Sequence, residues 1–224
     1  MSPPVPARIS SGGSVIEGLL DIPHNPAGVV LFAHGSGSSR HSPRNNYVAG
    51  VLRHSGTGTL LMDLLTPTEE EDTAARFDIG LLTARLVDAV RWLRGRPSAG
   101  TLPLGLFGAS TGAAAALEAA AALGTEVRAV VSRGGRPDLA SPLSLARVSA
   151  PTLLLVGSLD TEVVDLNRQA FAHLQCEKKM VLVPGATHLF EEPGTLEQVA
   201  TLAAEWFTGH FSRPAEARPR LPRP

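Results

Sequence analysis

The sequence lacks several features that would mark particular classes of protein. It has one cysteine, Cys176, so it cannot form an internal disulfide. No apolar run approaches the ~20 residues needed to cross a bilayer, and residues 1–10 lack the apolar core of a signal peptide. The net charge is −1, which argues against a nucleic-acid-binding surface. These absences predict a cytoplasmic protein that binds neither nucleic acid nor membrane.

Metal-binding patterns are also missing. The histidines outside the candidate site do not show the mutual spacing of a metal site, so we expect neither a metal nor another cofactor. These histidines are His24, His41, His54, His173 and His210. The oligomeric state cannot be predicted from these features.

The length and composition fit an α/β domain. The chain has 224 residues, of which 43% are hydrophobic, enough for a sizeable core. Apolar runs typical of buried strands alternate with segments of helical periodicity. This alternation predicts a mostly parallel, doubly wound sheet with helices on both faces. We assign residues 1–211 to a single domain and interpret residues 212–224, which are rich in proline and arginine, as a disordered tail.

The predicted elements follow from these patterns. The predicted strands cover residues 5–11, 14–21, 28–33, 59–63, 102–107, 127–131, 151–156 and 179–183, the first two as an antiparallel pair. The predicted helices cover residues 47–54, 79–94, 113–123, 161–175 and 195–211. We expect a solvated acidic loop at 66–73 and a loop or weak helix at 133–150. No segment is long enough for a large cap domain.

The most informative motif is Gly108-Ala109-Ser110-Thr111-Gly112. It has the pattern G-x-S-x-G between a predicted strand and a predicted helix, as in a nucleophile elbow. Such a turn holds the serine in a strained backbone conformation with its hydroxyl exposed. The two glycines let the strand and the helix approach closely. The alternative is a turn of small residues with no catalytic role.

Two further polar residues follow predicted strands. Asp160 comes after 151–156, and His188 comes after 179–183. Together with Ser110 they give the chain order Ser, Asp, His, which is that of α/β-hydrolases. Asp160 could instead cap the next helix, in which case Glu162 or Asp165 would be the acid.

Four segments together resemble the α/β-hydrolases of the dienelactone-hydrolase-like group. They are Phe32-Ala33-His34-Gly35-Ser36-Gly37, the Ser110 turn, Val156-Gly157-Ser158-Leu159-Asp160 and Gly185-Ala186-Thr187-His188-Leu189-Phe190. The resemblance covers about residues 14–211 and implies the α/β-hydrolase fold and hydrolysis. It does not imply lactone chemistry, because dienelactone hydrolase itself has a cysteine nucleophile where this chain has Ser110.

The resemblance and the chemistry of the side chains suggest roles. An imidazole titrates near neutrality, so His188 suits the general base that activates Ser110, with Asp160 orienting the ring. The resemblance implies an oxyanion hole formed by the N–H of Thr111 and an N–H of the loop after 28–33. We assign the second donor to Ser36, with Gly35 and Gly37 as the alternatives.

Arg133 and Arg136 follow the strand 127–131 and are candidates for binding a substrate carboxylate. The alternative is an ion pair with Asp138 within the same loop. The leading function is a serine hydrolase that cleaves small carboxylic esters. An acyltransferase or thioesterase could use the same triad, and a non-catalytic binding protein could use the same fold. A dehalogenase is disfavoured because its nucleophile at the elbow is an aspartate.

Overall fold

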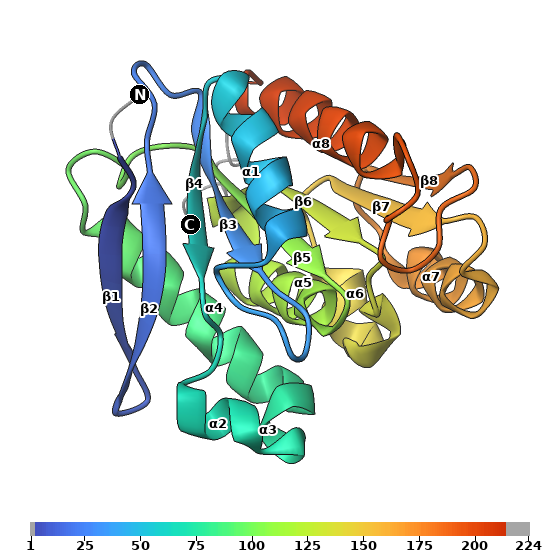
Figure 1. Ribbon diagram of the computed structural model, residues 1–224, viewed down its shortest axis with the longest axis horizontal. Helices are drawn as coiled ribbons and strands as arrows, with labels where there is room; N and C mark the ends of the chain where they lie inside the picture. The colour runs from blue at the N-terminus through green and yellow to red at the C-terminus, as the bar shows by residue number, and fades with distance from the viewer. Residues whose placement is uncertain (1–2, 214–224) are drawn as a thin grey trace, which may run out of the picture.

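The computed structural model describes residues 3–213. Its centre is an eight-stranded sheet in the order β1-β2-β4-β3-β5-β6-β7-β8 (Figure 1). The strands are β1 (Val5–Ser11), β2 (Ser14–Asp21), β3 (Gly28–Ala33), β4 (Thr57–Met62), β5 (Leu104–Ala109), β6 (Val127–Arg133), β7 (Thr152–Gly157) and β8 (Lys178–Val183). β1 pairs with β2 and β2 with β4 in antiparallel fashion, and all other neighbours are parallel. The mostly parallel sheet predicted from the sequence is therefore confirmed.

Helices cover both faces of the sheet, which is also as predicted. One face carries α1 (Pro43–His54) and α8 (Thr195–Phe211), and the other carries α4 (Ile79–Arg94), α5 (Thr111–Leu123), α6 (Pro142–Arg147) and α7 (Thr161–His173) (Figure 1). Alternate residues of β3 point to opposite faces, so Val30 packs toward α1 and α8 while Leu31 packs toward α4 and α5. Both faces must be apolar in such a sheet, which explains the uninterrupted apolar run of β3.

The acidic segment expected to be a loop is helical. It forms α2 (Pro67–Glu71) and α3 (Thr73–Phe77), which lie beyond the carboxyl end of β4 (Figure 1). Thr66 and Glu69 form a capping box, in which each side chain accepts from the other residue's backbone N–H. This satisfies donors that would otherwise be free at the start of a short helix. The pattern Thr-Pro-x-Glu was therefore the signal that the charge of the segment obscured.

Segment 133–150 agrees with the predicted loop or weak helix, whereas other helices differ from their predicted bounds. α5 begins at Thr111 rather than residue 113, and α7 ends at His173 rather than residue 175. α1 begins at Pro43 rather than residue 47, because Ser42 caps it by accepting from the Asn45 N–H. Within 133–150 the structure has a short 3₁₀ turn at Pro137–Leu139 and the helix α6, capped by Ser141. Neither segment forms a large cap over the sheet.

The described part of the chain ends at Arg213, two residues after α8. Ser212 and Arg213 follow the helix directly, and Arg213 forms an ion pair with Glu177 at 2.6 Å. The rest of the predicted disordered tail, 214–224, lies outside the described residues. Within residues 3–213, no helix is both long and apolar enough to span a membrane.

Candidate active site

Ser110 stands on a strained turn at the carboxyl end of β5. Its backbone has φ 50° and ψ −125°, a region that costs a residue with a Cβ roughly 1–3 kcal/mol. The Ser110 carbonyl accepts the N–H groups of Ala113 and Arg136, both at 3.0 Å, and these bonds hold the turn in place. The sequence motif therefore adopts the conformation expected of a nucleophile elbow.

The glycines on either side of Ser110 are required by close packing. A Cβ on Gly112 would lie 2.3 Å from the Ala33 carbonyl oxygen, and one on Gly108 would lie 2.4 Å from the Cα of Ala113. Real Cβ atoms do not approach backbone this closely, so only glycine fits at both positions. The start of α5 is thereby pressed against the ends of β3 and β5. The first N–H groups of a helix have no partner within the helix, so those of Thr111 and Gly112 can face an anion here, whereas that of Ala113 donates to the Ser110 carbonyl.

Asp160 and His188 meet at the ends of two neighbouring strands. The Oδ2 of Asp160 lies 2.7 Å from the Nδ1 of His188. The two loops are held together because the Leu159 N–H donates to the Ala186 carbonyl at 3.0 Å. An ionised carboxylate only accepts, so the Nδ1 of His188 carries the proton and its Nε2 is free to act as a base.

The side chain of Asp160 contacts His188 rather than the start of α7. Asp160 occupies the N-cap position of α7, yet its side chain makes no capping hydrogen bond. Of the alternative acids, Asp165 pairs with Arg168 and Glu162 is exposed. Among the described residues, the Ser110 hydroxyl makes no hydrogen bond, and catalytic contacts of this kind are often long before substrate binds.

The two proposed oxyanion donors lie next to each other. The Ser36 N–H donates to the Oγ1 of Thr111 at 3.0 Å, which joins the loop after β3 to the first residue of α5. In this structure the predicted second donor, the Ser36 N–H, is thus already engaged, as is that of the alternative Gly37, which donates to Glu70 at 3.0 Å. Gly35 packs on Ser110, because a Cβ at Gly35 would lie 2.8 Å from the Ser110 Cβ. The Thr111 hydroxyl was not anticipated from the sequence.

His34 orders the loop after β3. Its Nδ1 lies 2.8 Å from the Gly35 carbonyl oxygen, and its Nε2 accepts the Leu64 N–H at 3.0 Å. Because an acceptor nitrogen cannot carry a proton, the ring is neutral with its proton on Nδ1. Burial lowers the pKa of His34, which favours this neutral form.

A narrow recess lies beside the oxyanion donors on the α4 side of the sheet. Its walls lie so close together that it has no room for a water molecule. The residues that line it are His34, Gly35, Ser36, Leu64, Leu65, Glu70, Arg76, Leu82 and Thr111. The recess is therefore not a ligand pocket of ordinary size in this structure.

The two arginines after β6 differ in their surroundings. Arg136 makes a bidentate pair with Asp138, with distances of 2.9 and 2.8 Å, which is the bracing pair considered for this loop. That pair raises the pKa of Arg136. Arg133 is buried and has no carboxylate within 4 Å among the described residues. No cluster of three or more candidate metal ligands occurs within residues 3–213.

The fold and the strand-end site define an α/β-hydrolase. Residues 18–210 match the model of the dienelactone hydrolase family. The chain therefore belongs to the dienelactone hydrolase family, which supports a hydrolase activity.

Comparison with solved structures agrees. A dienelactone hydrolase from Anabaena variabilis is 54% identical, with a TM-score of 0.89 over 93% of this chain and 99% of that one. A serine hydrolase without a lid from Xanthomonas campestris is 21% identical, with a TM-score of 0.75 over 98% of both chains, and shows the fold alone.

A relative with a different name is similar over most of this chain. A Mycobacterium tuberculosis protein named "putative phosphoribosyl transferase" is 57% identical over 207 residues, which make up 92% of this chain and 46% of that protein. The chain thus spans less than half the length of this curated relative. That name describes a protein about twice as long as the matched segment.

Proposed function

We propose that the chain is a serine hydrolase that cleaves carboxylic esters through an acyl-enzyme on Ser110. The observation that carries this proposal is the 2.7 Å contact of His188 with Asp160, at the sheet edge where Ser110 stands on its strained turn. A serine hydroxyl is a poor nucleophile unless a base takes its proton during attack. His188, oriented by Asp160, is that base.

In the first half-reaction, the Ser110 Oγ attacks the ester carbonyl carbon and its proton passes to the Nε2 of His188. Asp160 stabilises the imidazolium that forms. The negative oxygen of the tetrahedral intermediate is stabilised by the N–H of Thr111 and by that of Ser36, which exchanges its hydrogen bond to the Thr111 hydroxyl for one to the oxyanion. The carbon–oxygen bond to the alcohol then breaks, and His188 returns the proton to the leaving alcohol.

In the second half-reaction, water takes the place of the alcohol. His188 accepts a proton from the water as its oxygen attacks the acyl carbon bound to Ser110. The second tetrahedral intermediate collapses, the bond to Ser110 breaks, and His188 returns the proton to the serine oxygen. The products are a carboxylic acid and the free enzyme, so each turnover consumes one water molecule.

Other functions remain alternatives for the same groups. An acyltransferase or thioesterase would keep the first half-reaction and change the acceptor or the leaving group. A binding protein would have no turnover. The name of the mycobacterial relative describes a protein of which this chain spans 46%, and the matched family model is that of a hydrolase. We therefore propose hydrolysis rather than phosphoribosyl transfer.

Covalent labelling tests the proposal directly. A fluorophosphonate probe should add one phosphonyl group to the wild-type chain, with loss of fluoride as HF, and none to Ser110→Ala, as measured by intact mass spectrometry. A folded wild-type chain that neither reacts with the probe nor hydrolyses p-nitrophenyl acetate would contradict the proposal. Product analysis with and without an added alcohol separates hydrolysis from acyl transfer.

A further inference from the structure

His188 lies in a loop whose shape is set by hydrogen bonds rather than by burial of the imidazole. The side chain of His188 is 38% exposed, and Leu189 after it is also exposed. Thr187 and Phe190 close a turn around these two residues, because the Phe190 N–H donates to the Thr187 carbonyl at 3.4 Å. The contact with Asp160 fixes one ring nitrogen of His188, but it does not fix the backbone that carries the ring.

The carboxylate of Glu192 holds the residue directly before His188. Its Oε1 accepts the Thr187 hydroxyl at 2.6 Å, and its Oε2 accepts the Thr187 N–H at 3.1 Å. The bond from the Thr187 hydroxyl lowers the pKa of Glu192, so the group is ionised at neutral pH and both of its oxygens accept. Hydrogen bonds to an ionised acceptor are stronger than those between neutral groups. One planar carboxylate thus fixes both the backbone and the side chain of Thr187.

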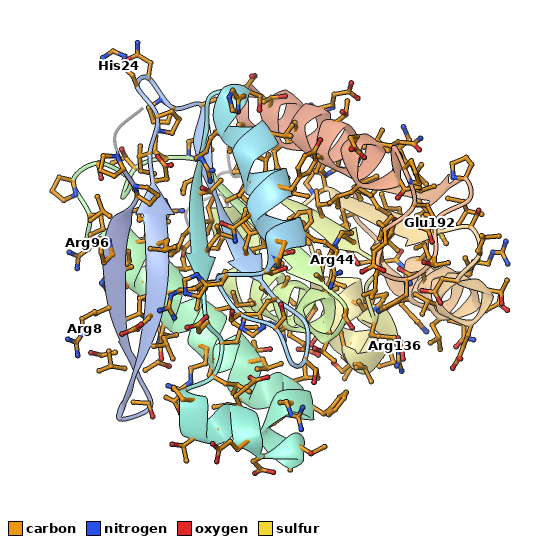
Figure 2. All side chains as sticks on the ribbon, viewed as in Figure 1. Arg8, His24, Arg44, Arg96, Arg136 and Glu192 are labelled. Atoms are coloured by element: carbon orange, nitrogen blue, oxygen red, sulfur yellow. The ribbon has the colours of Figure 1, made fainter. Side chains whose placement is uncertain are left out.

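The backbone of Glu192 is in turn anchored to the start of α8. The Glu192 carbonyl accepts the Thr195 N–H at 3.1 Å and the Thr195 hydroxyl at 2.7 Å. Thr195 is buried, and α8 packs against α1 and β6. Figure 2 shows Glu192 on the segment that joins β8 to α8. A continuous path of hydrogen bonds therefore runs from the helix through Glu192 to Thr187, next to the proposed base.

The backbone of this loop is strained and needs such support. Phe190 has φ +55°, which is unfavourable for a residue with a Cβ. Its side chain is buried, so packing of the ring opposes the strain on that side of His188. On the other side, Gly185 has φ +72° and leaves the chain free to turn. The bonds from Glu192 to Thr187 restrain the segment between these two positions.

We propose that Glu192 is a positioning residue for His188. It acts through Thr187 rather than on the substrate, and it keeps the imidazole in line with both Asp160 and Ser110. The inference rests on the proposed function, because it assigns to Glu192 the alignment of the base that activates Ser110. It adds a residue outside the triad on which the rate of both half-reactions depends.

Steady-state kinetics with p-nitrophenyl acetate give the first test. Glu192→Ala should lower kcat about 10- to 100-fold, since displacement of a catalytic group by ~1 Å can cost ~10²-fold. KM should change little, because His188 serves both half-reactions and both are slowed. Glu192→Gln keeps one carbonyl oxygen for Thr187 and should lose less than Glu192→Ala. Glu191→Ala is the matched control, because that acid pairs with Arg44 at 2.9 Å and should stay near wild type.

Thr187 offers a pair of variants that separate its hydroxyl from its backbone. Thr187→Val removes the hydroxyl that donates to Glu192 and should lower kcat several-fold, whereas Thr187→Ser keeps the hydroxyl and should stay near wild type. In the Glu192→Ala background, Thr187→Val should have little further effect, because the partner of the hydroxyl is already gone. Full additivity of the two losses in kcat would overturn the pairing.

Proton NMR measures the position of the imidazole without turnover. The Nδ1 proton between His188 and Asp160 should give a strongly deshielded resonance, identified by its loss in His188→Gln. We expect this resonance to broaden or move upfield in Glu192→Ala and to stay unchanged in Glu191→Ala. A role of Glu192 in stability alone would lower the Tm and leave the resonance of the folded protein in place.

The outcomes decide between these roles. An unchanged kcat in folded Glu192→Ala, with or without a lower Tm, would overturn the proposal. If Glu192→Ala does not fold, a kcat of Thr187→Val equal to that of wild type has the same meaning. If the wild type neither hydrolyses esters nor reacts with the fluorophosphonate, the proposed function fails, and a changed His188 resonance in Glu192→Ala would still support the positioning role. An active wild type whose His188 resonance is identical in Glu192→Ala would leave hydrolysis standing and overturn the positioning role.

Discussion

The amide of Ser36 donates to the hydroxyl of Thr111 across 3.0 Å, so one side chain joins the two segments that carry the proposed oxyanion donors. Thr111 is buried, and its own N–H lies at the free end of α5. Its hydroxyl keeps a proton after accepting from Ser36. The alignment of the Ser36 loop therefore depends on a hydroxyl at position 111.

Substitutions at Thr111 should separate the role of its hydroxyl from the role of its backbone N–H. Thr111→Val keeps the shape and the backbone N–H but removes the partner of Ser36, so kcat for p-nitrophenyl acetate should fall about 10- to 100-fold, less than the ~10²- to 10³-fold for outright loss of an oxyanion donor. KM should change little. Thr111→Ser keeps the hydroxyl and should stay near wild type. Equal activity of Thr111→Val and wild type would show that the hydrogen bond between Ser36 and Thr111 has no role in catalysis.

Ser110→Ala should abolish ester hydrolysis and leave the fold intact. Loss of the nucleophile in such triads costs several orders of magnitude in kcat. The hydroxyl makes no hydrogen bond among the described residues, so its removal takes little from packing. Steady-state kinetics and thermal unfolding measure the two effects. Residual turnover close to wild type would assign the nucleophile elsewhere.

The three acids near α7 should differ sharply in their effect on kcat. Asp160→Asn removes the charge that faces the Nδ1 of His188, and we expect a loss of about 10³- to 10⁴-fold. Glu162→Gln and Asp165→Asn are matched controls on the exposed side of the helix and should lie within a few-fold of wild type. A larger effect from either control would identify a different acid.

Acidification should destabilise the protein through His34. Burial lowers the folded-state pKa of His34, despite the opposing charges of Asp63 and Glu70, so the unfolded chain binds the proton first. Neutral His34 makes its whole contribution to the free energy of unfolding above the unfolded-state pKa of about 6.5. This contribution is lost as the pH falls from there through the lower pKa of the folded state. The Tm of wild type should thus fall more than that of His34→Gln between pH 7.5 and 5. Parallel curves for the two proteins would rule out this contribution.

The lack of a large cap over the site within residues 3–213 should limit the acyl chain. Without walls for a long chain, kcat/KM for p-nitrophenyl esters should peak at about C2 to C6. An optimum at C12 or beyond in the wild type would mean that a loop closes over the acyl chain.

Much of the fold was predictable because strands buried on both faces have uninterrupted apolar sequences. The final helix matches its prediction at Thr195–Phe211, since its apolar residues repeat at helical spacing and face the sheet. The acidic helix α2 was missed because its charges suggested a solvated loop, although Thr66 and Glu69 had the spacing of a capping box. Capping residues therefore determine where these short helices form, and the hydrophobic pattern alone does not predict them.

The candidate site was only partly predictable from the sequence. Chain order identified Ser110, Asp160 and His188, because each follows a strand and parallel strands end at the same edge of the sheet. The roles of these residues remain predictions for the experiments above. The contacts of Asn45 with Arg133 and of Ser36 with Thr111 join segments far apart in the chain. No local pattern predicts such contacts, because they depend on how side chains pack after the sheet has formed.

The order of strands in the sheet has a consequence for biosynthesis. Within residues 3–213, the strand before His188, β8, is the outermost at one edge of the sheet and pairs only with β7. During synthesis on a ribosome, the nucleophile turn and the oxyanion loop emerge well before this strand. The protein therefore remains without its proposed base until the last strand docks. Recovery of esterase activity during refolding should then trail the burial of the central strands, so enzymatic assay would report completion of the sheet rather than early collapse.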